Sequence, residues 1–333
     1  HNVCNLQRRE KYTLTCFCHN FSNYDSHFIV RALAKLTPKR DIYAIPLNTQ
    51  KFKAIMVDRR IRFLDSIAFL PGSLTSLVDT MRQSTSTFPI MMQWVEEDYE
   101  RELLMRKGVY PYDFATSISK LKTTKKLPTR DEFYNTLTRE ECSEEDYNHA
   151  RAVWQAFNCK NMMDYTRLYV HSDVHLLADV VMNFRKTVWR EFRLDMCQYL
   201  SLPHMTLDAM LKKTRASIDL ITDQEMANLL RKNIRGGLSY AGLRHAESEQ
   251  GSQAIVLLDA NSLYAAAMQF PLPQADFKWM TEEELEDFDP YREPLDSDEY
   301  GHILEVDLEY PVEVHLAHNS YPLAPESRAI PED

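Results

Sequence analysis

Apolar residues near the start of the chain occur in short runs that are typical of strands. The runs at 13–18, 52–57 and 61–64 predict three strands, and the polar residues 58–60 predict a hairpin turn between the last two. After the first run, a polar loop ends at Asp25, which opens a segment with apolar residues at helical spacing. A predicted strand therefore delivers a carboxylate to the start of a predicted helix.

Three later segments repeat apolar residues at the spacing of a helix. One begins near Ser73, and a second runs from Ser143, which three acidic residues follow, to about residue 157. The third is predicted over 172–193, and its apolar stripe consists of Val174, Leu177, Val181, Phe184, Val188 and Phe192. Strands followed by helices in this order fit an α/β fold of the RNase H-like nuclease kind and also other α/β folds.

A second strand-to-helix junction lies near the end of the chain. The apolar run 254–258 predicts a buried strand, which delivers Asp259 to a tight turn and then to a short helix with Tyr264 near its start. Further on, residues 310–316 predict another strand. Asp259 fits two roles at such a junction: a ligand for Mg²⁺ and a triphosphate, or the cap of the following helix.

Tyr169 and Asp173 are four residues apart, so on a helix they share one face. A phenol that positions water beside a metal-bound carboxylate suits hydrolysis. The alternative is that Ser172 or Asp173 caps the predicted helix and that Tyr169 packs.

Composition and charge limit the function classes. The chain has 333 residues and a net charge of −10, but residues 281–313 contain fourteen acidic residues and one basic residue. The remaining residues sum to about +3, so the acidity is a local, solvated insertion and does not oppose nucleic-acid binding elsewhere. No apolar run approaches the roughly eighteen residues of a membrane span. The six cysteines indicate reduced thiols in an intracellular protein, in either the nucleus or the cytoplasm.

Two smaller features have more than one interpretation. A basic cluster in a Thr/Pro-bearing loop fits either a solvated loop or a DNA-backbone contact, and it consists of Lys120, Lys122, Lys125, Lys126 and Arg130. His1 and Cys4 could form half of a zinc site, but zinc needs four ligands.

Asp259-Ala-Asn-Ser-Leu-Tyr264 resembles motif A of the family B DNA polymerases, and most closely that of the protein-primed branch in viruses, linear plasmids and self-synthesising transposons. The resemblance implies that Asp259 binds the catalytic metals, and that Ser262, Leu263 and Tyr264 contact the incoming nucleotide. Tyr264 would stack under the sugar and exclude a 2′-hydroxyl. Ala265 stands where the family motif has Pro.

The segment from His19 to Asp25 resembles the Exo II motif of the same family's proofreading domain, and Tyr169 with Asp173 is similar to Exo III. The resemblance implies that Asp25 and Asp173 bind metal, that Tyr169 orients the attacking water and that Asn20 contacts single-stranded DNA. Ser66, followed by Ile67, resembles a Ser/Thr-Leu element that holds single-stranded DNA or the terminal protein.

Arg235, Gly236 and Gly237 resemble the Tyr-x-Gly-Gly element that links the exonuclease and polymerase domains in protein-primed enzymes, with Ile234 in place of Tyr. The resemblance implies that these residues contact DNA. Paired glycines allow close backbone approach, and Arg235 can bind a phosphate. The alternative is a simple hairpin or domain-joining turn.

Several parts that the resemblance requires lie outside this sequence. The Asp-x-Glu pair of Exo I does not precede Asp25, and neither motif B nor the Asp-x-Asp of motif C follows Asp259. We therefore expect an internal piece of a longer enzyme. It would comprise an exonuclease-like domain (1–200), a connecting region (201–245) and the start of the palm (246–333).

The resemblance thus predicts part of a protein-primed DNA polymerase with 3′–5′ proofreading. It implies two-metal Mg²⁺ sites, and as partners dNTPs, a DNA primer-template, single-stranded DNA and a terminal protein, with no membrane. Alone, the chain is expected to be inactive. Two alternatives remain: a nucleic-acid-binding relic without catalysis, or a stand-alone Mg²⁺-dependent exonuclease that adds a carboxylate such as Asp65 or Asp179.

Overall fold

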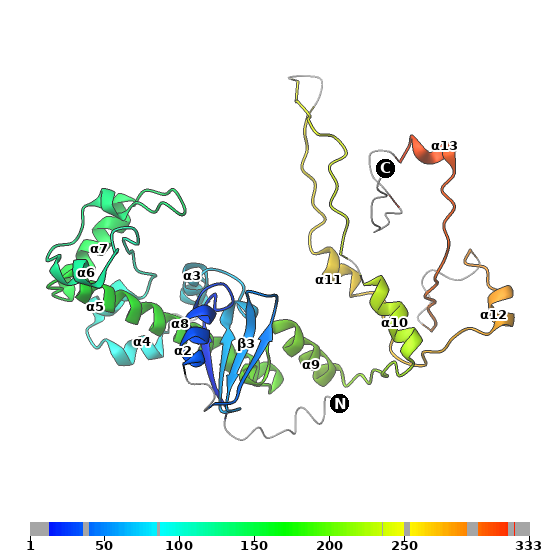
Figure 1. Ribbon diagram of the computed structural model, residues 1–333, viewed down its shortest axis with the longest axis horizontal. Helices are drawn as coiled ribbons and strands as arrows, with labels where there is room; N and C mark the ends of the chain where they lie inside the picture. The colour runs from blue at the N-terminus through cyan, green and yellow to red at the C-terminus, as the bar shows by residue number, and fades with distance from the viewer. Residues whose placement is uncertain are drawn as a thin grey trace. The chain divides into compact units, whose positions relative to one another are not determined.

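The computed structural model describes residues 13–35, 40–84, 87–234, 236–249, 254–291, 299–318 and 323. It divides into a first unit, His1–Ala216, and a second unit, Ser217–Asp333 (Figure 1). His1, Cys4 and Arg235 lie outside the described residues, and so does part of the acidic segment.

The described part of the first unit contains strands, α-helices and short 3₁₀ turns. The strands are β1 (Leu14–Cys18), β2 (Ile42–Pro46), β3 (Phe52–Val57) and β4 (Ile61–Asp65). The α-helices are α2 (Asp25–Ala34), α3 (Leu74–Ser84), α4 (Pro89–Trp94), α5 (Asp98–Leu104), α6 (Ile118–Thr123), α7 (Glu144–Ala156), α8 (Met162–Phe192) and α9 (Leu202–Thr214). Short 3₁₀ turns lie at Ser66–Ala68, Arg130–Phe133 and Met196–Gln198.

The strands form one mixed sheet in the order β1-β4-β3-β2. β4 pairs in parallel with β1 and antiparallel with β3, which in turn pairs antiparallel with β2. The predicted strands and the turn between β3 and β4 are confirmed. At that turn Asp58 and Arg59 have positive φ angles of 51° and 55°, which suits a tight hairpin. The predicted helix at Asp25 is confirmed as α2.

Helix α8 has 31 residues and begins ten residues earlier than predicted. Its N-cap is Asn161, whose side chain accepts a hydrogen bond from the backbone N–H of Asp164. Ser172 and Asp173 therefore lie inside the helix, and the interpretation that either residue caps it is wrong. The predicted caps at Ser73 and Ser143 are confirmed, since each hydroxyl accepts a backbone N–H three residues later.

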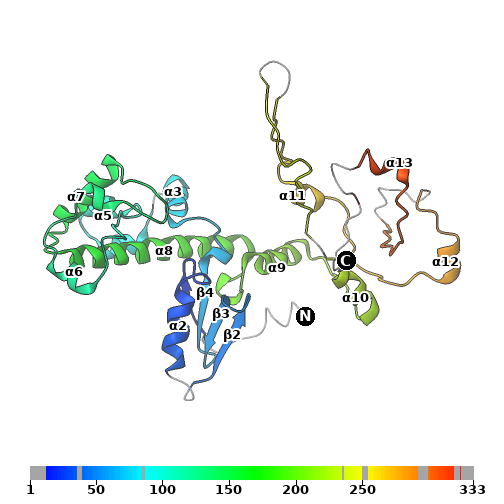
Figure 2. The same cartoon turned by 45° about the horizontal axis from the view of Figure 1, so that its top comes forward.

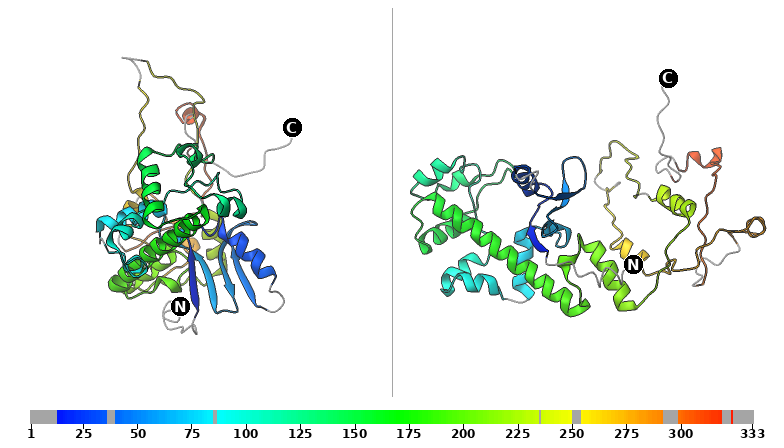
Figure 3. Two further views of the ribbon diagram at one scale, coloured as in Figure 1. Left: turned by 90° about the vertical axis from the view of Figure 1, so that its left-hand side faces the viewer. Right: turned by 60° about the horizontal axis from the view of Figure 1, so that its bottom comes forward.

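Two hydrophobic clusters share α8. One lies among helices α3 to α8, and the other lies between the sheet, the C-terminal half of α8 and α9. Leu70 and Leu177 pack against both clusters. Figure 2 shows α8 running from α6 and α7 at one end, past the sheet, towards α9, and the right-hand view in Figure 3 shows its full length. The mixed α/β class predicted from the sequence is confirmed.

The second unit has only short helices among its described residues. These helices are α10 (Gln224–Asn233), α11 (Leu263–Ala267), α12 (Glu282–Glu286) and α13 (Val312–His315). The predicted strand at 254–258 is wrong, because that segment is irregular and exposed. The predicted strand at 310–316 is also wrong, because α13 occupies its centre. No neighbouring strand is described in this unit that could satisfy the backbone of either run.

In the part of the chain that the structure describes, none of the helices combines the length and the apolar character that crossing a lipid bilayer requires.

Candidate active site

Several predicted residues lie at one edge of the sheet. Because β1 and β4 are parallel neighbours, with Cys18 opposite Asp65, the segments that follow both strands leave from the same edge. His19 Nδ1 lies 3.0 Å from the Ser66 hydroxyl oxygen, and the Asn20 backbone N–H donates to Asp65 Oδ1 at 3.0 Å. The structure thus brings Asn20 and Ser66 together, although they are far apart in the sequence.

Asp25 belongs to the same edge. It is the first residue of α2 and is half-buried, and a carboxylate there is favoured by the helix dipole. The Ser26 backbone N–H donates to the Phe21 carbonyl at 3.0 Å, which ties the start of α2 to the loop that follows β1. Burial, followed by the charges of Asp25, Cys16 and Asp65, raises the pKa of Cys18 at the end of β1 to about 11.

Asn20 and Ser66 differ in accessibility. Asn20 is exposed and has a φ of 66°, a left-handed conformation that Asn tolerates better than most residues. Its side-chain oxygen accepts from Asn23 Nδ2 at 2.7 Å. Ser66 is fully buried and donates to the Cys18 carbonyl, so its accessible neighbour is the His19 ring.

Tyr169 and Asp173 form a second group, one turn apart on α8. Lys107 Nζ donates to Asp173 Oδ2 at 3.0 Å and to the Tyr169 hydroxyl at 3.2 Å. The hydroxyls of Tyr112 and Tyr169 lie 2.5 Å apart. The sequence pattern predicts no role for Lys107 or Tyr112. They lie about sixty residues before their partners, and the only local signal is a lysine next to a glycine and tyrosines.

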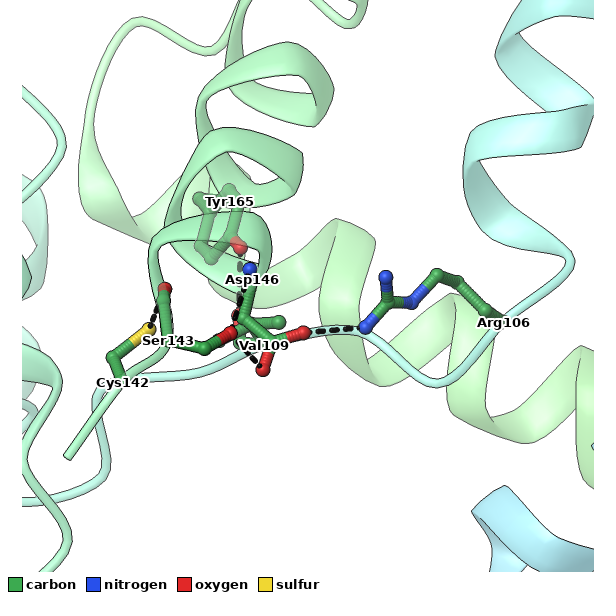
Figure 4. Close-up of polar contacts among 6 residues, drawn as sticks. All are labelled: Arg106, Val109, Cys142, Ser143, Asp146 and Tyr165. Carbon is green, nitrogen blue, oxygen red and sulfur yellow. Dashed lines mark hydrogen bonds and ion pairs between the residues drawn. The ribbon is translucent and has the colours of Figure 1, made fainter. Parts of the chain in front are cut away.

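The loop that carries Lys107 is held on both sides, as Figure 4 shows in part. Arg106 forms an ion pair of 2.5 Å with Asp146 at the start of α7, and the Tyr165 hydroxyl donates to the Val109 carbonyl at 2.6 Å. Between them, a Cβ atom on Gly108 would lie only 2.9 Å from Cδ2 of Tyr169. These contacts fix the position of Lys107 against α8, and only glycine allows the ring of Tyr169 to approach so closely.

The protonation state of Tyr169 is set by its surroundings. Burial, the nearby charge of Asp173 and the hydrogen bond with Tyr112 raise the pKa of Tyr169 well above its usual range. The phenol therefore keeps its proton at neutral pH and can donate or orient a hydrogen bond. This is the state that the positioning of a water molecule requires.

The two carboxylate oxygens of Asp173 differ in their partners. Lys107 binds Oδ2, whereas Oδ1 is buried and has no hydrogen-bond partner. A carboxylate oxygen of this kind fits a hard cation such as Mg²⁺. Within the described ranges, however, no three His, Cys, Asp or Glu side chains lie close enough to hold a metal ion together. Asp173 fits the predicted metal as one ligand, and the described residues do not form a complete set.

Two further carboxylates, Asp65 and Asp179, bind backbone groups. A stand-alone nuclease would need one of them as an additional metal ligand. Asp65 accepts N–H bonds from Asn20, Ser22 and Ile67. Asp179 is 1% exposed and accepts from the backbone N–H groups of Ile90 and Met91 at the start of α4, both at 2.9 Å. Both carboxylates are buried and already bind the backbone, which argues against that form of the nuclease hypothesis.

The residues predicted for nucleotide binding lie in the second unit. The short helix after the turn is confirmed as α11, and its N-cap is Ser262, with a φ of 56°. Asp259 therefore does not cap this helix, and that alternative is wrong. Leu263 and Tyr264 are 62% and 80% exposed. The described residues of this unit thus do not enclose these two side chains.

Gly236 and Gly237 lie in open surroundings. A Cβ atom added to either glycine would meet no other atom within 4 Å, so there is room for the close approach of a ligand. Arg235, which completes this predicted element, lies outside the described residues. The five described cysteines are free thiols.

The site combines carboxylates at a sheet edge with a tyrosine–carboxylate pair on a helix. This arrangement suits metal-dependent chemistry on phosphates. The comparisons with known proteins identify the family of the chain. The family described as "DNA polymerase type B, organellar and viral" matches residues 6–326, and the chain belongs to it.

One curated relative is a "Probable DNA polymerase" from Ascobolus immersus. It is 27% identical over 271 residues, which cover 77% of this chain and 20% of the relative. The chain thus spans about a fifth of the length of that relative. No solved structure matches the chain significantly.

Proposed function

We propose that this chain is part of a DNA-directed DNA polymerase that also carries a 3′–5′ proofreading exonuclease. The observation that carries the proposal is the family match over residues 6–326, joined to the grouping of Lys107, Tyr169 and Asp173. In this proposal the first unit contains an RNase H-like exonuclease domain, and the second contains the start of the palm. The substrates are a DNA primer-template, single-stranded DNA and dNTPs.

For the exonuclease, Asp25 and Asp173 would hold the metal, and the unpartnered Oδ1 of Asp173 supports that assignment. Mg²⁺, when bound, would polarise the phosphate and stabilise its developing charge. Tyr169 keeps its proton and would orient the attacking water. Lys107 binds both the phenol and the Asp173 carboxylate and so fixes their positions relative to each other. Asn20, beside Ser66 and His19 at the sheet edge, would contact the single strand.

For polymerisation, Asp259 would bind metal in the whole enzyme, and Ser262, Leu263 and Tyr264 would contact the incoming nucleotide. Arg235, Gly236 and Gly237 would contact the DNA between the two sites. The order of these motifs resembles the protein-primed branch, so the primer would be a terminal protein. The exposure of Tyr264 implies that other parts of the polymerase complete this site.

The test separates the two activities in the whole polymerase. We expect Asp173→Ala to lower the removal of a 3′-mismatched nucleotide roughly a hundredfold or more while primer extension is retained. We expect Asp259→Ala to abolish extension and to retain mismatch removal. The control is Glu191→Ala, which changes an exposed carboxylate on the same helix as Asp173.

Full mismatch removal by the Asp173→Ala enzyme would reject the exonuclease assignment. Primer extension by the Asp259→Ala enzyme would reject the polymerase assignment. Salt-dependent DNA binding without either activity in the unmodified enzyme would instead favour the non-catalytic binding protein.

A further inference from the structure

The segment between Asp113 and Asp131 contains no acidic residue and five cations. These cations, which we call the basic cluster, are Lys120, Lys122, Lys125, Lys126 and Arg130. The sequence pattern predicts a loop here, and the structure corrects this in part: Lys120 and Lys122 lie on α6, and the others follow it.

Three members of the basic cluster are unpaired. Lys122, Lys125 and Lys126 are exposed, and none of their ammonium groups makes an ion pair or hydrogen bond with another described residue. Lys120 differs, because its Nζ lies 3.7 Å from the centre of the Phe114 ring. The cluster therefore offers three adjacent positive charges with no protein partner among the described residues.

The basic cluster lies at one end of the helix face that carries the Asp173 site. The Thr124 carbonyl, between Lys122 and Lys125, accepts the backbone N–H of Met162 at 2.9 Å. Along α8, the residues Met162, Tyr165, Tyr169 and Asp173 follow one another at spacings of three or four, so they share one helix face. Met162 and Tyr165 are buried in the core, so this face sets the distance between the cluster and Asp173 and is not itself a surface for a ligand. Eleven residues of helix separate Met162 from Asp173, which corresponds to roughly 16 Å.

An aromatic ring lies between the cluster and Asp173. Tyr112 is 53% exposed, contacts Tyr169 through its hydroxyl, and precedes by two residues the Phe114 ring under Lys120. Cations that follow a backbone, combined with an accessible aromatic ring on which a base can stack, are the features of surfaces that bind single strands.

We propose that Lys122, Lys125 and Lys126 contact successive phosphates of a single nucleic-acid strand that passes the exposed Tyr112 ring on its way to Asp173. This inference rests on the proposed function, because it gives the Asp173 site its substrate path. An acidic peptide would match the charges but would leave the Tyr112 ring unused.

Binding is measured by fluorescence anisotropy with a labelled oligothymidylate of about 16 nucleotides, the upper end of common site sizes. The measurement is made in EDTA with KCl between about 50 and 200 mM, so that no hydrolysis occurs. The test variant is Lys122→Gln/Lys125→Gln/Lys126→Gln. The matched control is Lys213→Gln/Arg231→Gln/Lys232→Gln, which removes three exposed positive charges from α9 and α10.

Each phosphate contact on a single strand contributes about 0.7 to the slope of log affinity against log salt, so we expect the test variant to lower the slope by about 2. The control is expected to keep the unmodified slope, and both variants the unmodified circular dichroism spectrum. An unchanged slope in the test variant, an equal loss in the control, or no binding by the unmodified protein would overturn the inference. The proposed function is tested separately, by mismatch removal in the whole polymerase. If Asp173→Ala lowers mismatch removal there, any of those results overturns only this inference.

Discussion

Leu64 in the first unit and Leu257 in the second both belong to short apolar runs, but Leu64 is fully buried and Leu257 is 96% exposed. The same contrast holds throughout the two units. The first unit has two clusters of buried residues, whereas none of the described residues after Ala216 is buried.

The difference lies in the neighbours that each run has. β4 pairs with β1 on one side and with β3 on the other, and α8 covers its apolar side chains. The run 254–258 has no described strand beside it and no helix over it. A strand gains its stability from such pairing and covering. The run before Asp259 therefore does not form a strand on the strength of its own residues.

The largest effect in this comparison is expected from truncating the two leucines. Leu64→Ala should lower the free energy of unfolding of the first unit by about 3 kcal/mol, because it leaves a cavity in a packed core. Leu257→Ala should change the same quantity by less than about 0.5 kcal/mol. Urea denaturation followed by tryptophan fluorescence measures both. A comparable loss in both variants would mean that residue 257 is buried in solution.

A smaller effect is expected from adding a methyl group to one glycine in each unit. Gly108→Ala places Cβ against the Tyr169 ring and should cost about 2 kcal/mol of unfolding free energy. It should also displace Tyr169 and thus reduce mismatch removal. Gly237→Ala meets no atom within 4 Å and should leave the thermal unfolding of the first unit unchanged. A Gly108→Ala protein with full stability and activity would contradict the tight approach.

The smallest effect concerns pH. Burial alone would raise the pKa of Asp195, but two hydrogen bonds from Arg185, at 2.8 and 2.6 Å, and one from the Cys197 backbone N–H hold it below its usual range. Since the folded pKa is the lower one, this stabilisation is present above the ordinary aspartate pKa of about 3.9 and is lost as pH falls through the folded pKa.

Asp195→Asn should therefore remove about 1 kcal/mol of stability at neutral pH and flatten the acid limb of a stability–pH curve measured by urea denaturation. Asp223→Asn, at an exposed helix cap in the second unit, should leave the curve of the first unit unchanged. An unaltered acid limb in the Asp195→Asn protein would show that the pair with Arg185 does not form in solution.

Much of the fold of the first unit could be predicted from local patterns. The strands β1, β3 and β4 and the helices α2, α3 and α7 follow from apolar spacing and from polar caps. β2, Ile42–Pro46, is also a short apolar run but is not among the predicted strands, and it pairs antiparallel with β3. The predicted start of α8 was wrong for a physical reason: the polar residue Asp173 resembled a cap, but Lys107 from another segment satisfies it inside the helix.

Part of the candidate site could be predicted from local sequence, and part depends on tertiary contacts. The spacing of Tyr169 and Asp173 on one helix face could be predicted from the sequence, and so could the carboxylate of Asp25 at the start of α2. The contacts of Lys107 and Tyr112 could not, because only tertiary packing brings them to α8. In the second unit, the predicted strand before Asp259 failed because apolar pattern cannot supply a pairing partner.

Helix α8 belongs to both hydrophobic clusters, and Leu177 packs against each of them. Because α8 forms part of each cluster, unwinding this helix would expose both. We therefore expect the first unit to unfold as one cooperative body. Tyr169 and Asp173 lie on the helix that joins the two clusters, so the rigidity of the candidate site draws on the stability of the whole unit.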